Sequence, residues 1–189
     1  MSRIVSWLLI IVWIVVFSGG VQAEGRDAQV FIGLEVPNQF DFSAHGKKAS
    51  KVTGTLLSMR FKTLLGLGYD QIIVSYYEPQ VGETVILENE FLNLSYRFFH
   101  GVFEGVVGAG VGSSEAYCNQ CAGIYSIGSG TQVFMRGYLN LGKIGISSST
   151  GILSSSVLGQ TVETADGVIA IPGINTSGQY IAVGAKYGF

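Results

Sequence analysis

The sequence predicts an all-β protein, an eight-stranded antiparallel up-and-down β-barrel that spans a membrane. Apolar and polar residues alternate with a period of two along most of the chain, which is typical of strands with one face in an apolar environment. Eight such segments can be counted, and the connections between them are alternately long and short. An up-and-down barrel gathers alternate connections at the same end, so this pattern predicts long loops at one end and short turns at the other.

The N-terminal residues 1–23 are predicted to be a cleaved signal peptide. Arg3 precedes the apolar run Ile4 to Phe17, and small residues, including Val21 and Ala23, follow it. The run is shorter than the ~20 residues of a membrane-spanning helix. An uncleaved inner-membrane anchor is the alternative. We therefore expect one domain, an outer-membrane β-barrel formed by residues 24–189.

The composition of residues 24–189 fits a membrane barrel better than a soluble domain. Loss of Arg3 leaves 10 basic against 13 acidic residues, so no excess of positive charge indicates nucleic-acid binding. The full sequence, with residues 1–23 included, has 27 glycines and 3 prolines, and its mean hydropathy is +0.41. Few charged side chains would remain to cover a water-exposed surface, which favours contact with lipid.

The first four predicted strands span 27–36, 52–61, 64–77 and 85–99. Their apolar faces carry, in order, Leu34, Leu57, Leu67 and Leu94. Their opposite faces carry glycine or polar residues, such as Gly33, Ser58, Gly66 and Asn93. In the third strand the pair Asp70-Gln71 interrupts the pattern, and we predict a β-bulge there.

The last four predicted strands span 102–112, 131–141, 144–153 and 177–189. Val107, Val133 and Val183 belong to apolar faces, whereas Gly108 and Gln132 belong to opposite faces. The predicted long loops are 37–51, 78–84, 113–130 and 154–178. Short turns are expected at 62–63, 100–101 and 142–143. We expect the long loops to face the outside of the cell and the short turns to face the periplasm.

Aromatic residues gather at the expected periplasmic ends of the apolar faces. Such rings form girdles at the membrane–water interface of barrels. The predicted members are Phe61, Phe98, Phe103, Tyr187 and Phe189, and Tyr76 and Tyr77 are assigned to a second girdle at the outer end.

The signal peptide, the opening VFIGLEV, the internal LSYRFF and the closing YIAVGAKYGF resemble the small outer-membrane β-barrel proteins of Gram-negative bacteria. Opacity-type surface antigens and the OmpA-type transmembrane domain are the most similar groups. The resemblance implies a location in the outer membrane, in contact with its lipid. It also implies that the last strand, with Tyr187 and the terminal Phe189, is the signal read by the barrel-assembly machinery.

The inward faces of the predicted strands collect charges of both signs, at Glu35, Arg60, Arg97, Glu104, Arg136 and Lys186. An eight-stranded barrel is just wide enough for side chains to fill it. Charges in that space must pair, because an unpaired buried charge is costly. A plugged lumen with a structural ion-pair network is the favoured interpretation, and a gated ion pathway is the alternative.

Two cysteines, Cys118 and Cys121, lie in the third long loop. Outside the cytosol we expect them to form a disulfide, while a metal site, redox chemistry and free thiols remain alternatives. Asp41, Ser43 and His45 share the first loop, but their spacing matches no nucleophile motif. His100 falls in a periplasmic turn. We predict no catalytic residues, no metal ligands and no cofactor.

Function is predicted only by class. The favoured interpretation is a surface or structural barrel whose loops bind an extracellular ligand, and the ligand itself is not indicated by any motif. An outer-membrane lipid-modifying enzyme and a small gated pore are the alternatives. A soluble lipocalin-like barrel would require the apolar faces to point inward and the charged faces to meet water.

Overall fold

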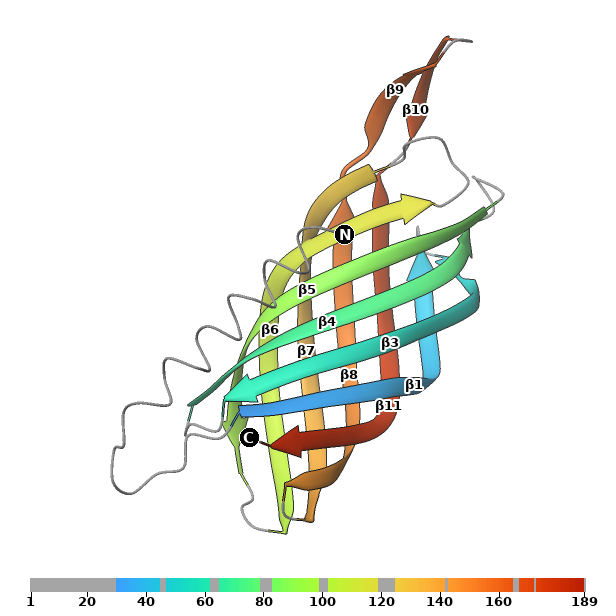
Figure 1. Ribbon diagram of the computed structural model, residues 1–189. Coiled ribbons are helices and arrows are strands. Elements are labelled where there is room, and N and C mark those ends of the chain that lie inside the picture. The colour runs from blue at the N-terminus through green and yellow to red at the C-terminus, as the bar shows by residue number, and fades with distance from the viewer. Residues whose placement is uncertain are drawn as a thin grey trace.

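The computed structural model describes residues 30–44, 47–61, 65–78, 83–98, 102–118, 125–141, 143–164, 167–171 and 173–188. The described chain forms a closed, eight-stranded, antiparallel up-and-down barrel, so the predicted fold class is confirmed (Figure 1). No helix in these ranges is long and apolar enough to span a bilayer.

Each strand of the barrel pairs with its neighbour along the chain. The barrel strands are β1 (Val30–Ala44), β3 (Ser50–Phe61), β4 (Leu65–Glu78), β5 (Glu83–Arg97), β6 (Phe103–Cys118), β7 (Tyr125–Leu141), β8 (Ile144–Val157) and β11 (Ile174–Gly188). The short β2 (Lys47–Lys48) extends the sheet beside β1. β9 (Gln160–Thr164) and β10 (Gly167–Ile171) form a separate hairpin that projects beyond one end of the barrel (Figure 1).

The barrel closes through the pairing of β1 with β11. The register runs from Phe31 opposite Gly188 to Ala44 opposite Thr176. This pairing satisfies the outer backbone groups of both strands, which would otherwise be left without partners in lipid. The connection between β7 and β8, near residue 143, lies at the end where β11 finishes, which we call the short-turn end. The opposite end, which bears the β9–β10 hairpin, is the hairpin end.

Strands continue into segments that the sequence analysis assigned to long loops. β1 and β3 occupy most of the predicted loop 37–51, and β6 and β7 occupy 113–118 and 125–130 of the predicted loop 113–130. β8 and β11 likewise extend into 154–178. The side chains of these segments still alternate between the two faces of the barrel wall, with Phe42, Ala116 and Val157 buried on the inner face. Their serines and glycines suggested loops because the outer face of this region is polar.

The predicted bulge is placed wrongly. β4 pairs with β5 in unbroken register through Asp70 and Gln71. Register shifts occur instead in β3, between Ser50 and Thr53 against β4, and in β1, between Pro37 and Gln39 against β11. Proline lacks a backbone N–H and therefore cannot donate to the ladder, which explains why the irregularity lies there.

The direction of the side chains is that of a membrane barrel. Apolar residues lie exposed on the outer face of the barrel; Leu67 and Leu92 are 62% and 71% exposed. The charged residues Glu35 and Arg136 are buried inside, at 0% and 3%. A soluble barrel would have the opposite arrangement, so the lipocalin-like alternative is wrong.

The seam between β1 and β3 is the incomplete part of the sheet. Residues 30–35 of β1 pair with 56–61 of β3. Near the hairpin end, Ser43 pairs with Lys48, and the amide of Ala49 donates to the carbonyl of Phe42 at 2.8 Å. Between these points, the described structure shows no pairing of residues 36–41 with β3.

We expect faster amide hydrogen exchange at the unpaired part of this seam. Amides of residues 36–41 that point toward β3 have no ladder acceptor, whereas those of residues 30–35 do. Exchange of the folded protein in detergent micelles, followed by NMR, measures the difference. The fully paired β5–β6 seam is the internal control. Equal protection along the whole of β1 would contradict this expectation.

Candidate functional site

The barrel interior is divided into two zones. The half nearer the hairpin end is filled mainly by apolar side chains, and we call it the apolar plug. The half nearer the short-turn end is filled by charged and amide side chains, and we call it the charged zone. The apolar plug consists of Phe42, Ala44, Leu56, Ile72, Val74, Tyr76, Val85, Leu87, Phe91, Ala116, Leu153, Val157, Ile174, Tyr180 and Ala182.

Aromatic rings fill the centre of the apolar plug. The ring centroids of Phe42 and Tyr76 are 5.3 Å apart, and both side chains are fully buried. Tyr180 lies across Gly151, where a β-carbon would come within 2.6 Å of the ring. A larger residue at position 151 would displace this ring. Gly151 on β8 therefore leaves the space that the Tyr180 ring on β11 occupies.

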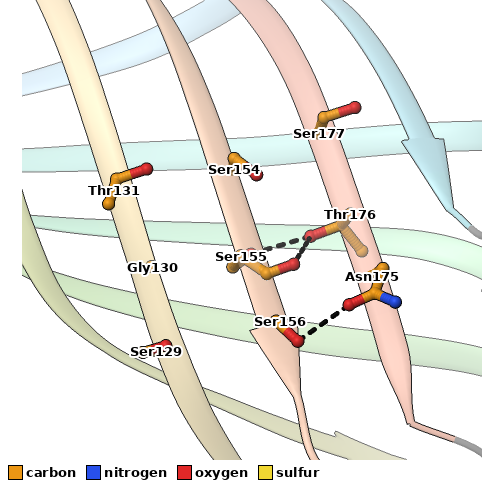
Figure 2. Close-up of a pocket in the computed structure, with 9 residues that line it drawn as sticks. All are labelled: Ser129, Gly130, Thr131, Ser154, Ser155, Ser156, Asn175, Thr176 and Ser177. Carbon is orange, nitrogen blue, oxygen red and sulfur yellow. Dashed lines mark hydrogen bonds between the residues drawn. The ribbon is translucent and has the colours of Figure 1, made fainter.

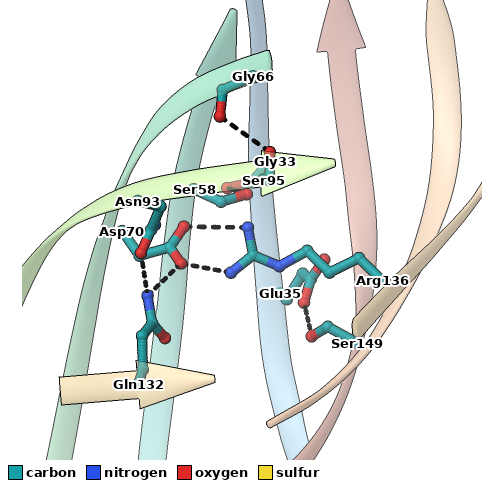
Figure 3. A network of polar contacts seen from close by, with 10 residues as sticks. All are labelled: Gly33, Glu35, Ser58, Gly66, Asp70, Asn93, Ser95, Gln132, Arg136 and Ser149. Carbon is teal, nitrogen blue, oxygen red and sulfur yellow. Dashed lines mark hydrogen bonds and ion pairs between the residues drawn. The ribbon is translucent and has the colours of Figure 1, made fainter. Parts of the chain in front are cut away.

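The charged zone contains a buried network centred on Asp70 and Arg136 (Figure 3). Arg136 from β7 makes a bidentate contact, in which Nη1 donates to Oδ1 of Asp70 at 3.0 Å and Nη2 donates to Oδ2. Gln132 donates from Nε2 to Asp70 at 2.6 Å and to Oδ1 of Asn93 at 2.7 Å. Paired hydrogen bonds of this type fix geometry as well as charge, so the network ties β4, β5 and β7 together across the lumen.

A second group in the charged zone surrounds Glu104. Its carboxylate forms an ion pair with Arg60 and lies 3.8 Å from Nζ of Lys186. The ring of Tyr138 lies beneath both cations, with its centroid 4.1 Å from the Lys186 ammonium and 5.5 Å from the Arg60 guanidinium. One carboxylate and one aromatic face thus hold two positive charges inside the barrel.

Glu35 is the third buried carboxylate, and it differs from the other two. It is fully buried and accepts a hydrogen bond from the hydroxyl of Ser149 on its Oε2 atom (Figure 3). Within the described part of the chain its Oε1 atom has no hydrogen-bond partner. Together with Asp70 and Glu104 it matches the three fully buried cations in number, so the formal charges of these six residues cancel. The three cations are Arg60, Arg136 and Lys186.

Five of the six residues assigned to the lumen are buried there, namely Glu35, Arg60, Glu104, Arg136 and Lys186. Arg97 is half-buried near the end of β5. The structure brings Arg60, Glu104 and Lys186 together, and it gives Arg136 a partner that the sequence analysis missed. That partner, Asp70, has the same parity as Gly66 and Gly68 along β4. Continuing the alternation through Asp70 would have placed it in the lumen.

The apolar plug was also missed, and one assignment of the outer girdle is wrong. Tyr76 is fully buried in the plug because it shares its parity with Ile72 and Val74. The signal was present in the sequence, since residues 72–77 are largely apolar on both faces. Apolar residues on both faces indicate apolar surroundings on the inner side of the strand as well as on the outer one.

Other predicted residues lie outside the lumen or outside the described residues. Tyr187 is exposed on the outer face of β11, while residues 1–23, His45, His100, Cys121, Phe189 and the side chain of Cys118 fall outside the described part. The disulfide, the signal peptide and the terminal signal therefore stay predictions. Asp41 forms an exposed ion pair with Lys48 at 3.1 Å. Among the described residues, no group of three or more His, Cys, Asp or Glu is placed to hold a metal ion.

The fold is similar to that of solved outer-membrane barrels. Neisserial surface protein A (NspA) matches with a TM-score of 0.64 and 14% identity, over 88% of this chain and all of that one. The outer membrane protein OprG of Pseudomonas aeruginosa matches with a TM-score of 0.46 and 12% identity, over 86% and 96% of the two chains. Ail, the attachment invasion locus protein of Yersinia pestis, gives 0.44 and 13%, over 85% and 97%. No protein-family model matches the sequence, and no curated protein matches it either.

The similarity to NspA confirms, at the level of the fold, the predicted resemblance to small outer-membrane barrels. An outer-membrane location follows from this fold together with the exposed apolar belt. Closed antiparallel barrels satisfy their backbone hydrogen bonds without water, and their apolar outer side chains meet lipid.

The Asp70–Arg136 pair provides a test of the charged zone. We expect Asp70→Ala to destabilise the barrel by about 3–5 kcal/mol, because it leaves the Arg136 charge buried without its partner. The double variant Asp70→Leu with Arg136→Met should recover much of that loss, since it removes both charges. Urea unfolding in phospholipid vesicles measures the free energies.

The matched control is Asp41→Ala, which removes an ion pair whose side chains are 60% and 76% exposed. We expect a loss below about 1 kcal/mol there, because exposed pairs are screened by water. Equal losses for Asp70→Ala and Asp41→Ala would show that the buried pair has no special place in the barrel.

Proposed function

We propose that the protein is an outer-membrane barrel with a closed lumen that acts at the cell surface through its hairpin end. The observation that carries this proposal is the filling of the lumen by two zones, the charged zone and the apolar plug, which lie one after the other along the barrel axis. Ions would have to pass the charged zone and then the apolar plug. The interior therefore serves stability, and binding is left to the parts of the chain outside the bilayer.

The charged zone alone would be a poor barrier, because water can enter wherever ion pairs open. The apolar plug forms a second barrier along the lumen. Cavities lined by Leu, Ile and Phe stay dry even when they are large enough to hold a molecule. A path that lacks water carries no ions.

The hairpin end offers the surface for partners. The β9–β10 hairpin extends beyond the barrel, and the strands themselves continue toward it (Figure 1). Binding residues in such scaffolds concentrate in segments held out by a rigid frame. A disulfide between Cys118 and Cys121 would add a covalent link in the neighbouring connection between β6 and β7. We infer that an extracellular ligand binds at this end.

Conductance measurements test the closed lumen. We expect no steady current from the wild-type protein in planar bilayers. Glu104→Gln should remain closed because the apolar plug is intact, and Phe42→Ala with Tyr76→Ala should remain closed because the charged zone is intact. Only the combined triple variant should conduct, since both barriers are then weakened.

Heat-modifiable gel mobility must first show that each variant is folded. A steady wild-type current would favour the small gated pore. Current from Glu104→Gln alone would mean that the apolar plug does not close the lumen.

The lipid-modifying enzyme makes a different prediction. If the barrel is a surface binder, expression in a Gram-negative host should leave the masses of lipid A and phospholipids unchanged. Lipid mass spectrometry of cells with and without the protein measures this. A new lipid species that disappears in His45→Ala would instead support an enzyme, with Asp41 and Ser43 as the residues to test next.

A further inference from the structure

A patch of hydroxyl and amide side chains covers the outer face of β7, β8 and β11 toward the hairpin end (Figure 2). Six exposed residues form it in two rows of cross-strand neighbours. The first row is Thr131, Ser154 and Ser177, and the second is Ser129, Ser156 and Asn175. We call this set the hydroxyl grid.

The surface at the hydroxyl grid is depressed. It lines a shallow depression of about 400 Å³, together with Gly130, Ser155 and Thr176, whose side chains are buried or absent. This volume is within the range of small-molecule sites, about 300–1,000 Å³. Ser156 donates to the Oδ1 atom of Asn175 at 2.7 Å, which fixes the amide at one edge (Figure 2). The other hydroxyls of the grid remain exposed to a ligand.

Apolar side chains border the hydroxyl grid on the side facing the membrane. The next row of cross-strand pairs joins Val133 to Ile152, which are 59% and 54% exposed, and Ile152 to the exposed Gln179. Ile181 and Val183 continue this lipid-facing surface on β11. Two residues along a strand cover about 6.8 Å, so the hydroxyls begin one such step above Val133 and Ile152, and the exposed Ile127 follows on the far side of the grid on β7. The outer face of β7 and β8 changes at this step from valine and isoleucine to hydroxyls, as expected where acyl chains end and head groups begin.

Charge distinguishes between the possible head groups. None of the nine residues lining the depression is charged. Along the grid's second row, Ser129 is opposite Ser113, and Ser113 is opposite Glu90. Glu88 and Glu115 form the neighbouring pair. Along the first row Ser177 is opposite Ser43, and Ser43 is opposite Lys48, whose charge is paired with Asp41. The carboxylates would repel phosphate, while uncharged hydroxyls donate to and accept from sugar hydroxyls equally well.

We propose that the hydroxyl grid binds the saccharide head group of an outer-leaflet glycolipid whose acyl chains lie on Val133, Ile152 and Ile181. The neutral sugar occupies the depression, and its hydroxyls exchange hydrogen bonds with the two rows. The lipid-facing surface and the grid are continuous, so one molecule contacts both. This site lies on the outer wall of the barrel and does not depend on whether the lumen conducts.

Lipid retention tests the proposal. The folded protein is placed in nanodiscs that contain equal amounts of digalactosyldiacylglycerol, phosphatidylcholine and phosphatidylglycerol with matched acyl chains. Native mass spectrometry then reports the retained lipids. We expect the galactolipid to be enriched on the wild-type protein. Each hydrogen bond removed should weaken retention about fivefold, so Thr131→Val, Ser154→Ala and Ser177→Ala together should abolish the enrichment.

The matched control is Ser148→Ala with Thr150→Val. These residues have the same chemistry and lie exposed on β8, but they lie within the apolar belt, below the grid. The control should keep the enrichment. Equal retention of all three lipids by the wild type, enrichment of the phosphatidylglycerol, or equal loss in the control would each overturn the proposal.

A second measurement needs no variant. Adding the galactolipid to the wild-type barrel in phosphatidylcholine micelles should shift the amide NMR signals of Ser129, Ser154 and Ser177, and leave that of Glu88 unchanged. Shifts spread evenly around the barrel would overturn the proposal. So would equal shifts with the soluble disaccharide lactose at the same concentration, because the apolar rows would then contribute nothing.

Discussion

The hydrogen-bonded pairing of β1 with β11 is the constraint on which the rest of this molecule depends. Without it, two strand edges would face lipid with their backbone groups unsatisfied, and each such group costs several kcal/mol. The pairing extends from Phe31 to Ala44, and it includes an irregularity at Pro37. Closure is therefore strongest where β1 also pairs with β3, and weaker on the β3 side toward the hairpin end.

Closure decides what each face of every strand can carry. The outer face meets hydrocarbon and takes leucine, valine and isoleucine. The inner face encloses a narrow space in which charges need partners, and the barrel meets this need with pairs such as Asp70–Arg136 and Arg60–Glu104. Toward the hairpin end the inner face becomes apolar instead. There the chain resembles a small soluble protein, with a hydrophobic core inside and hydroxyls outside.

The period of two was enough to predict the fold, the direction of the faces and the buried position of residues such as Glu104. It failed where the pattern has two explanations. Asp70 was interpreted as part of a β-bulge because it interrupts an otherwise apolar or glycine-rich segment. Its position in the alternation, two residues after Gly68, nevertheless places it on the inner face. The serines of β8 and β11 within 154–178 suggested a loop, because a strand outside the membrane does not need apolar residues on its outer face. Which carboxylate meets which cation depends on contacts across the barrel, and a period along one strand carries no information about them.

The two zones of the lumen also explain why the outer wall changes character with height. At the short-turn end the interior is polar and the wall is apolar, as lipid requires, and at the level of Phe91, Leu153 and Ala182 both the interior and the wall are apolar. Above, the interior is apolar, so folding no longer needs apolar residues on the wall, and the wall is open to binding chemistry. The charges on this wall are distributed unequally: Glu88, Glu90 and Glu115 lie on one side, the Lys48–Asp41 pair lies on the other, and the uncharged hydroxyl grid lies between them. A wall selected only for solubility would gain from charge on every strand. The absence of charge from all nine residues that line the depression is the feature that a neutral, hydroxyl-bearing ligand accounts for.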